Sequence, residues 1–130
     1  MEIKRAKDIE VEVSREGRNI FRTIDHELIG EGDNLIITRV VIPKDIVEQR
    51  HYHKNVNEFI YFLSPAISIV EGKDYEMKPH DVLILDKGEK HHLSAEKNQV
   101  EVLVIKKAWP DKVECWWTAK TALSIANYIT

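Results

Sequence analysis

The sequence is a series of short apolar runs separated by turn residues. Residues 9–13 (IEVEV) alternate strictly, so that Ile9, Val11 and Val13 lie on one face of an extended chain. β-Branched residues dominate the run at 35–42, which is typical of strands. By the same criteria we expect further strands at 18–24, 46–53, 58–63, 66–70, 74–78, 82–85, 91–95 and 100–106.

The spacing of these runs predicts an all-β fold. Few helical patterns lie between them, which favours an antiparallel sandwich or barrel. The EGK stretch at 71–73 joins two of the runs and is a hairpin signal. Beyond residue 106 the pattern is ambiguous, because residues 119–129 have apolar positions at helical spacing while 113–118 suit a final strand equally well. The sequence has no linker, so we expect one domain over residues 1–130.

Two histidines, His51 and His53, are one residue apart in the run at 46–53. In a strand, residues i and i+2 project to the same side, about 7 Å apart at the backbone. Both imidazoles can therefore converge on one ion. The intervening Tyr52 is expected to face away from that ion.

Glu58 is five residues beyond His53. On an unbroken strand this odd offset would send it to the opposite face. The polar residues 54–57 favour a turn, so Glu58 begins the next strand and can face the same ion. Alternation along this strand then points Ile60 and Phe62 inward, with the residues between them facing outward.

Composition narrows the classes of function. The 130 residues suit one domain, and the net charge of −3 comes without a basic tract, so we do not expect a nucleic-acid partner. The longest apolar runs have about five residues, far short of the roughly 20 that a membrane span needs. Residues 1–10 lack the apolar stretch of a signal peptide. The single cysteine, Cys115, excludes an intrachain disulfide, and we expect a cytoplasmic protein.

The stretch from Asp45 to Pro65 resembles the first motif of the cupin family. That motif is a glycine, five residues, HxH, three or four residues, a glutamate, six residues and a glycine. His51, His53 and Glu58 match it, while Asp45 and Pro65 stand at its two glycine positions.

The stretch from His80 to Ala95 resembles the second cupin motif. That motif is a glycine, five residues, PxGxxH, three residues and an asparagine. Gly88 and His91 match it. His80, Asp86 and Ala95 stand where the family has its first glycine, its proline and its asparagine. The resemblance covers about residues 35 to 106.

The resemblance implies a double-stranded β-helix, or jelly-roll barrel, with a short C-terminal extension here. It also implies that His51, His53, Glu58 and His91 bind one divalent transition metal ion. His92 is an alternative to His91, although the Gly-x-x-His spacing favours His91. Three imidazoles and a carboxylate suit Fe, Mn, Ni, Co, Cu or Zn, and the sequence does not choose among them.

Two classes of function are compatible with such a site. The first is a metal-dependent enzyme of the dioxygenase, isomerase or decarboxylase type that acts on a small polar organic molecule. The second is a non-catalytic metal- or ligand-binding module. Apolar residues beyond the last motif strand, including Trp116 and Trp117, favour a homodimer, although the tail can instead cover its own barrel.

Overall fold

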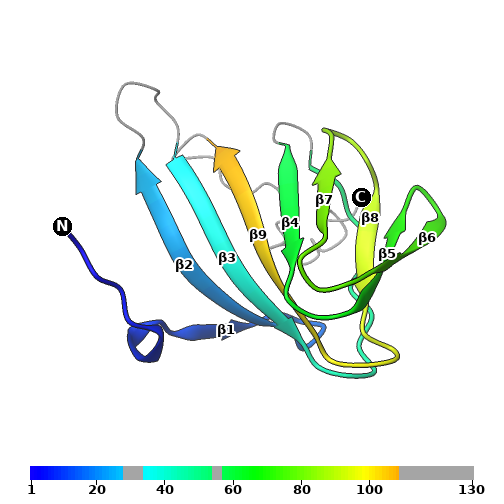
Figure 1. Cartoon of the computed structure of the whole chain (residues 1–130), viewed down its shortest axis with the longest axis horizontal. Coiled ribbons are helices and arrows are strands. Elements are labelled where there is room, and N and C mark those ends of the chain that lie inside the picture. Colours follow the sequence, from blue (N-terminus) through cyan, green and yellow to red (C-terminus); the bar gives the residue numbers. More distant parts are fainter. Residues whose placement is uncertain (28–33, 54–56, 109–130) are drawn as a thin grey trace.

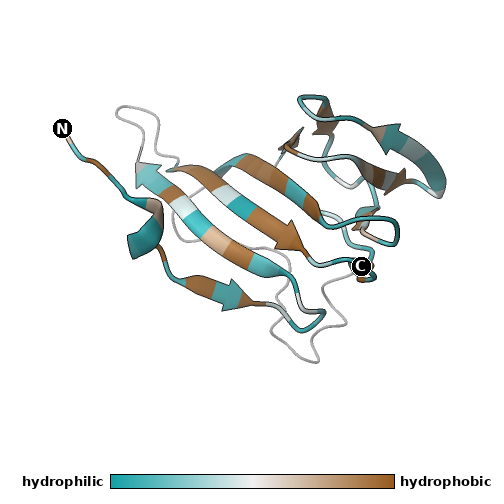
Figure 2. Ribbon diagram, turned by 60° about the horizontal axis from the view of Figure 1, so that its bottom comes forward, coloured by the Kyte–Doolittle hydropathy of each residue, from teal (hydrophilic) through white to brown (hydrophobic). Residues whose placement is uncertain are grey.

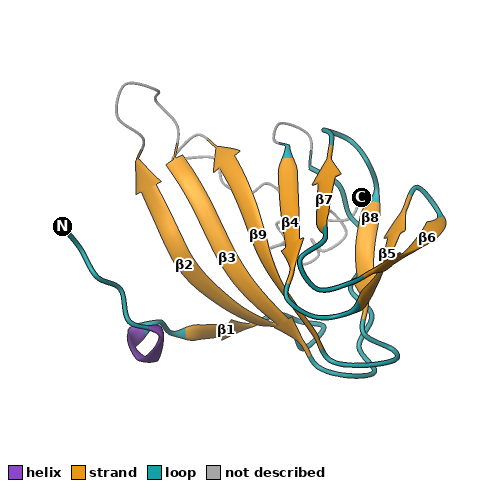
Figure 3. Ribbon diagram, in the orientation of Figure 1, coloured by secondary structure: helices purple, strands orange, loops and turns teal. Residues whose placement is uncertain are grey.

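The computed structural model describes residues 1–27, 34–53 and 57–108 of the chain, and the regular secondary structure of these residues is almost entirely β (Figure 3). One short 3₁₀ helix, η1 (Ala6–Asp8), comes first. The strands are β1 (Val11–Val13), β2 (Asn19–Glu27), β3 (Asn34–Ile42), β4 (Glu58–Phe62), β5 (Ala66–Val70), β6 (Lys73–Met77), β7 (Val82–Leu85), β8 (His91–Ser94) and β9 (Val100–Ala108).

The strands form two antiparallel sheets (Figure 1). The larger sheet has six strands in the order β1-β2-β3-β9-β4-β7, and the smaller has three in the order β6-β5-β8. The chain crosses between the sheets after β4, after β6, after β7 and after β8, which gives the jelly-roll connectivity. The predicted fold class is therefore confirmed.

The core lies between the inner faces of the two sheets. Strict alternation along the strands supplies it, as in β4, where Glu58, Ile60 and Phe62 are buried and Phe59 is exposed. Figure 2 shows the same alternation of hydrophobic and hydrophilic residues along strands of the larger sheet. The inward register predicted for β4 is thus confirmed. In β7 the inward positions are Leu83 and Leu85, whereas Val82 and Ile84 face outward.

The outer face of the larger sheet also carries apolar side chains. One row crosses five strands through paired positions, namely Ile24, Ile37, Ile105, Phe59 and Ile84. Of these, Phe59 is 40% exposed and Ile84 is 61% exposed. The row is continuous because directly opposed residues of neighbouring strands point to the same face.

The prediction of a regular strand at 46–53 is wrong, because the segment does not form a continuous ladder with its neighbour. Only two isolated bridges, Val47 to Ser94 and His51 to His91, pair this segment with β8. Four positions separate Val47 from His51, but three separate their partners, so the segment holds one extra residue, as in a β-bulge. Within the bulge the Glu48 carboxylate, and not a backbone carbonyl, accepts the hydrogen bond of the Leu93 N–H at 3.0 Å.

At two motif positions where another residue replaces glycine, the backbone has the conformation that glycine favours. Asp45 and His80 both have a φ of 77°, in the left-handed region, and both stand where the motif has glycine. The substitution changes the side chain without changing the turn. The predicted hairpin at 71–73 is also present, with positive φ at Glu71 and Gly72, as a two-residue type I′ connection requires.

Several expectations concern residues outside the described part of the chain. They are the helix or strand beyond residue 108, the turn at 54–56 and the role of the apolar tail that contains Trp116 and Trp117. Among the described residues, no helix is long and apolar enough to span a membrane.

Candidate metal centre

Three separate stretches of chain bring four side chains together at one end of the larger sheet. His51 and His53 come from the bulged segment, Glu58 is the first residue of β4 and His91 is the first residue of β8. One ligand atom from each residue lies within 4.8 Å of the others. Two atoms bound to one ion at about 2.1 Å lie roughly 3 to 4 Å apart, so a small contraction is enough for all four to reach a common ion.

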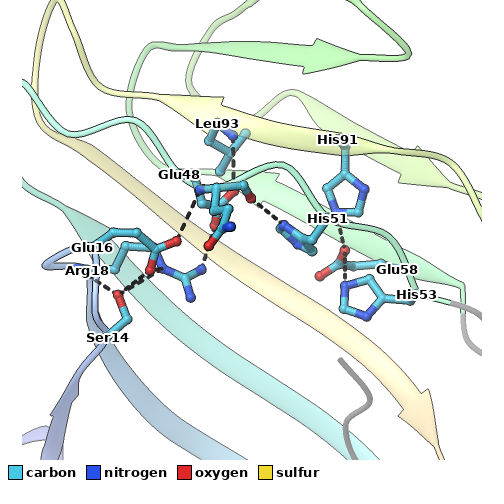
Figure 4. A network of polar contacts seen from close by, with 10 residues as sticks. Ser14, Glu16, Arg18, Glu48, His51, His53, Glu58, His91 and Leu93 are labelled. Atoms are coloured by element: carbon cyan, nitrogen blue, oxygen red, sulfur yellow. Dashed lines mark hydrogen bonds and ion pairs between the residues drawn. The ribbon is translucent and has the colours of Figure 1, made fainter. Parts of the chain in front are cut away.

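The cluster is buried. The exposed fractions are 8% for His51, 4% for His53, 5% for Glu58 and 3% for His91. Figure 4 shows the three imidazoles and the carboxylate pointing toward one another. The ring centroids of His51 and His91 are 4.4 Å apart. Polar side chains that are buried this deeply need partners, and here they face each other.

Backbone carbonyls fix the orientation of two of the histidines. His51 donates its Nδ1–H to the Gln49 carbonyl at 2.9 Å. His91 donates its Nδ1–H to the Glu89 carbonyl, also at 2.9 Å. A carbonyl can only accept, so each neutral ring carries its proton on Nδ1 and presents a lone pair at Nε2. This is the arrangement that metal-binding histidines usually have.

Glu58 shows why a cation suits the cluster. Its Oε1 lies 3.0 Å from Nε2 of His91 and 3.3 Å from Nε2 of His53. Oε1 and a neutral His91 Nε2 are both acceptors, and neither has a hydrogen-bond partner among the described residues. One proton can lie between only one nitrogen and the oxygen, whereas a single cation contacts all of them. The residues present therefore fit a metal ion.

The electrostatics of the cluster keep Glu58 ionised. Burial alone would raise the pKa of Glu58, but His53 and His91 outweigh it and hold that pKa well below its ordinary value. For His51, burial disfavours the protonated ring and so lowers the pKa, and the charges on His91 and His53 lower it further. For His91, burial is outweighed by Glu58, which raises the pKa. An anionic carboxylate beside a neutral His51 is a ready metal-binding pair.

A second buried network, which the sequence did not reveal, surrounds the bulge (Figure 4). Arg18 donates to Oε2 of Glu48 at 2.6 Å, and the other oxygen of Glu48 accepts from Leu93. Glu16 accepts from the N–H of Gln49 at 3.1 Å, the residue whose carbonyl orients His51. Burial raises the pKa of Glu48 against the opposing charge of Arg18.

The other histidines lie outside the cluster. His92, the alternative to His91, is half-buried and faces away from the group that the other four residues form. His26 and His80 are exposed, and His80 contacts the Tyr61 hydroxyl at 2.9 Å. Tyr52 is half-buried and does not belong to the group.

A small jelly roll with a His-His-Glu-His cluster at one end has the architecture of a cupin. A family model described as the cupin domain matches residues 37–106, more than half of the chain. The chain therefore belongs to the cupin family. Among curated proteins, no sequence matches it.

Solved structures share this fold at low sequence identity. A predicted oxalate decarboxylase from Thermotoga maritima is 21% identical, with a TM-score of 0.72 over 82% of this chain and 99% of that one. The polyketide cyclase RemF from Streptomyces resistomycificus is 17% identical, with a TM-score of 0.69 over 92% and 88%. Ectoine synthase from P. lautus is 23% identical, with a TM-score of 0.66 over 83% and 78%. The likeness establishes the fold.

Proposed function

We propose that this cupin is a metal-dependent enzyme that acts on a small polar organic molecule. His51, His53, Glu58 and His91 would hold one divalent transition metal ion. The observation that carries the proposal is the buried convergence of acceptor atoms, with Glu58 Oε1 3.0 Å from His91 Nε2. The varied names of the similar structures, a decarboxylase, a cyclase and a synthase among them, support catalysis on small molecules without selecting a reaction.

A bound ion would supply Lewis-acid polarisation, or redox chemistry if it is iron, copper or manganese. The chain's own residues do the rest. The Gln49 and Glu89 carbonyls hold the His51 and His91 rings in the tautomer that binds metal. Glu58 supplies the negative charge. The buried side chains of Ile60 and Phe62 continue the inner face of β4 beyond Glu58 and exclude water from that side.

The test is to measure metal content and then turnover. Protein purified without added metal should hold about one equivalent of a transition metal by elemental analysis. After removal of this metal, the protein should be reloaded separately with Fe(II) and with Zn(II). Each form is then assayed for dioxygen uptake, carbon dioxide release and isomerisation on a panel of small hydroxy and keto acids. Turnover with Fe(II) alone would indicate oxygenase chemistry, and turnover with both metals a non-redox reaction.

Full metal occupancy without metal-dependent turnover on the whole panel would contradict the enzyme and leave a metal- or ligand-binding module. Failure to bind an equivalent of any transition metal would contradict both. The turnover assays thus separate the two candidate functions, and the elemental analysis tests the metal centre itself.

We further propose that this single-domain protein is a cytoplasmic homodimer that pairs through the outer face of the larger sheet. The apolar row ending at Phe59 and Ile84 supports this, because exposed apolar rows on a sheet are common interfaces. Light scattering at micromolar concentration should give a mass near twice the 15.1 kDa of one chain. A charge in the row, as in Ile84→Lys, should yield monomers, and an unchanged mass for this variant would exclude this face as the interface.

A further inference from the structure

A lysine projects from the inner face of the larger sheet beside the candidate metal centre. Along β9 the inward positions are Val100 and Val102, which are buried, and Val104, which packs against the core. Lys106 is the next residue on this face, since side chains alternate along a strand. Its side chain is half-buried, as expected for a lysine whose stem packs along the sheet while its charged end stays accessible.

The register locates Lys106 more closely. Directly opposed residues of β4 and β9 pair as Phe62 with Val102, Ile60 with Val104 and Glu58 with Lys106. Opposed residues point to the same face with their Cβ atoms about 4.5 to 5.5 Å apart. Since Glu58 points into the cluster, the stem of Lys106 starts beside it.

We propose that Lys106 is a substrate-binding residue of this site, and that the substrate is a small carboxylate held between the metal ion and the Lys106 ammonium. This inference rests on the proposed function, because the ion is the second anchor. A divalent ion, Glu58 and Lys106 together carry a net charge of about +2, since Glu58 cancels one positive charge. An anionic ligand offsets that charge, whereas a neutral ligand leaves it in a buried site.

Lys107 provides a matched control. It is the next residue of β9, is exposed and projects from the opposite face. Lys106→Met and Lys107→Met make the same chemical change and alter the net charge equally. Any difference between them therefore reports the position beside the metal centre and not the overall charge of the protein.

The experiment measures ligand binding by calorimetry to protein loaded with Co(II), with malonate as the anionic probe and malonamide as its neutral counterpart. Lys106→Met should weaken malonate binding by at least about tenfold, since a charge-assisted hydrogen bond is lost, and should change malonamide binding little. Lys106→Arg should retain most of the malonate affinity. Co(II) should bind to Lys106→Met at least as tightly as to the wild type, because a nearby positive charge has been removed.

Each other outcome contradicts the inference. Lys106→Met that binds malonate like the wild type, or Lys107→Met that loses as much, would remove Lys106 from the site. Wild-type Co(II) protein that binds malonate no better than malonamide would exclude a carboxylate substrate. Lys106→Met that loses Co(II) and malonate together would give the lysine a structural role. A wild-type chain that does not take up Co(II) contradicts the proposed metal centre itself, which is a separate failure.

Discussion

We expect the double variant His51→Ala/His53→Ala to lose stoichiometric metal binding. The change removes two of the three imidazoles that converge at the centre and leaves Glu58 and His91 as a two-ligand site. Changing only the residues that orient metal ligands typically costs 10- to 100-fold in affinity, so losing two ligands should cost more than about 10³-fold. Equilibrium dialysis followed by elemental analysis measures the remaining occupancy.

The matched control for this experiment is His26→Ala/His92→Ala. It removes the same two side chains from positions outside the cluster, and it should keep a full equivalent of metal. Circular dichroism of both variants shows whether the fold is intact. Tight binding of one equivalent by His51→Ala/His53→Ala would rule out the ligand assignment, and loss of metal from the control would point to His92 as a ligand.

Arg18→Met should lower the free energy of unfolding by about 3 to 5 kcal/mol, the typical effect of removing one partner from a buried ion pair. The side chains of Arg18 and Glu48 are only 10% and 8% exposed. Without Arg18, the Glu48 carboxylate remains buried with the Leu93 N–H as its remaining donor in the network. Urea denaturation of metal-free protein at neutral pH measures the loss.

Two comparisons make this prediction specific. Arg22→Met removes an exposed partner of Glu12, with both side chains more than half exposed, and should cost less than about 1 kcal/mol. The difference in unfolding free energy between the wild type and Arg18→Met should also become smaller as the pH falls. Burial raises the pKa of Glu48, and protonation of Glu48 removes the unpaired buried charge. Equal losses for Arg18→Met and Arg22→Met would contradict a special role for the buried pair.

Local patterns were enough to predict most strands and three of the four clustered residues. Alternation gave the inward face of β4, and the HxH pair followed by a turn gave the convergence of His51, His53 and Glu58. His91 needed the motif resemblance, because nothing local links β8 to residues about 40 positions earlier in the chain. The strands β5 and β7 were predicted with their observed bounds.

The bulge could not be predicted from alternation. In an unbroken strand Val47 would share a face with His51 and His53, yet Val47 is 41% exposed while both histidines are buried. Glu48 is buried as well, three positions before His51, which strict alternation forbids. Its partner Arg18 is 30 residues away, so only the folded chain brings the pair together.

The broken pairing of the bulged segment has a kinetic consequence. Nine consecutive residue pairs join β3 to β9, whereas the segment from Val47 to His51 pairs with β8 in only two isolated bridges, with the hydrogen bonds between Glu48 and Leu93 in between. We expect a segment with such sparse pairing to open on its own at a free energy below that of global unfolding. Amide protons of the segment should exchange with solvent sooner than those of β3. An ion held by both His51 and His91 would span the break, so we expect its residence time to depend on how often this segment detaches from β8.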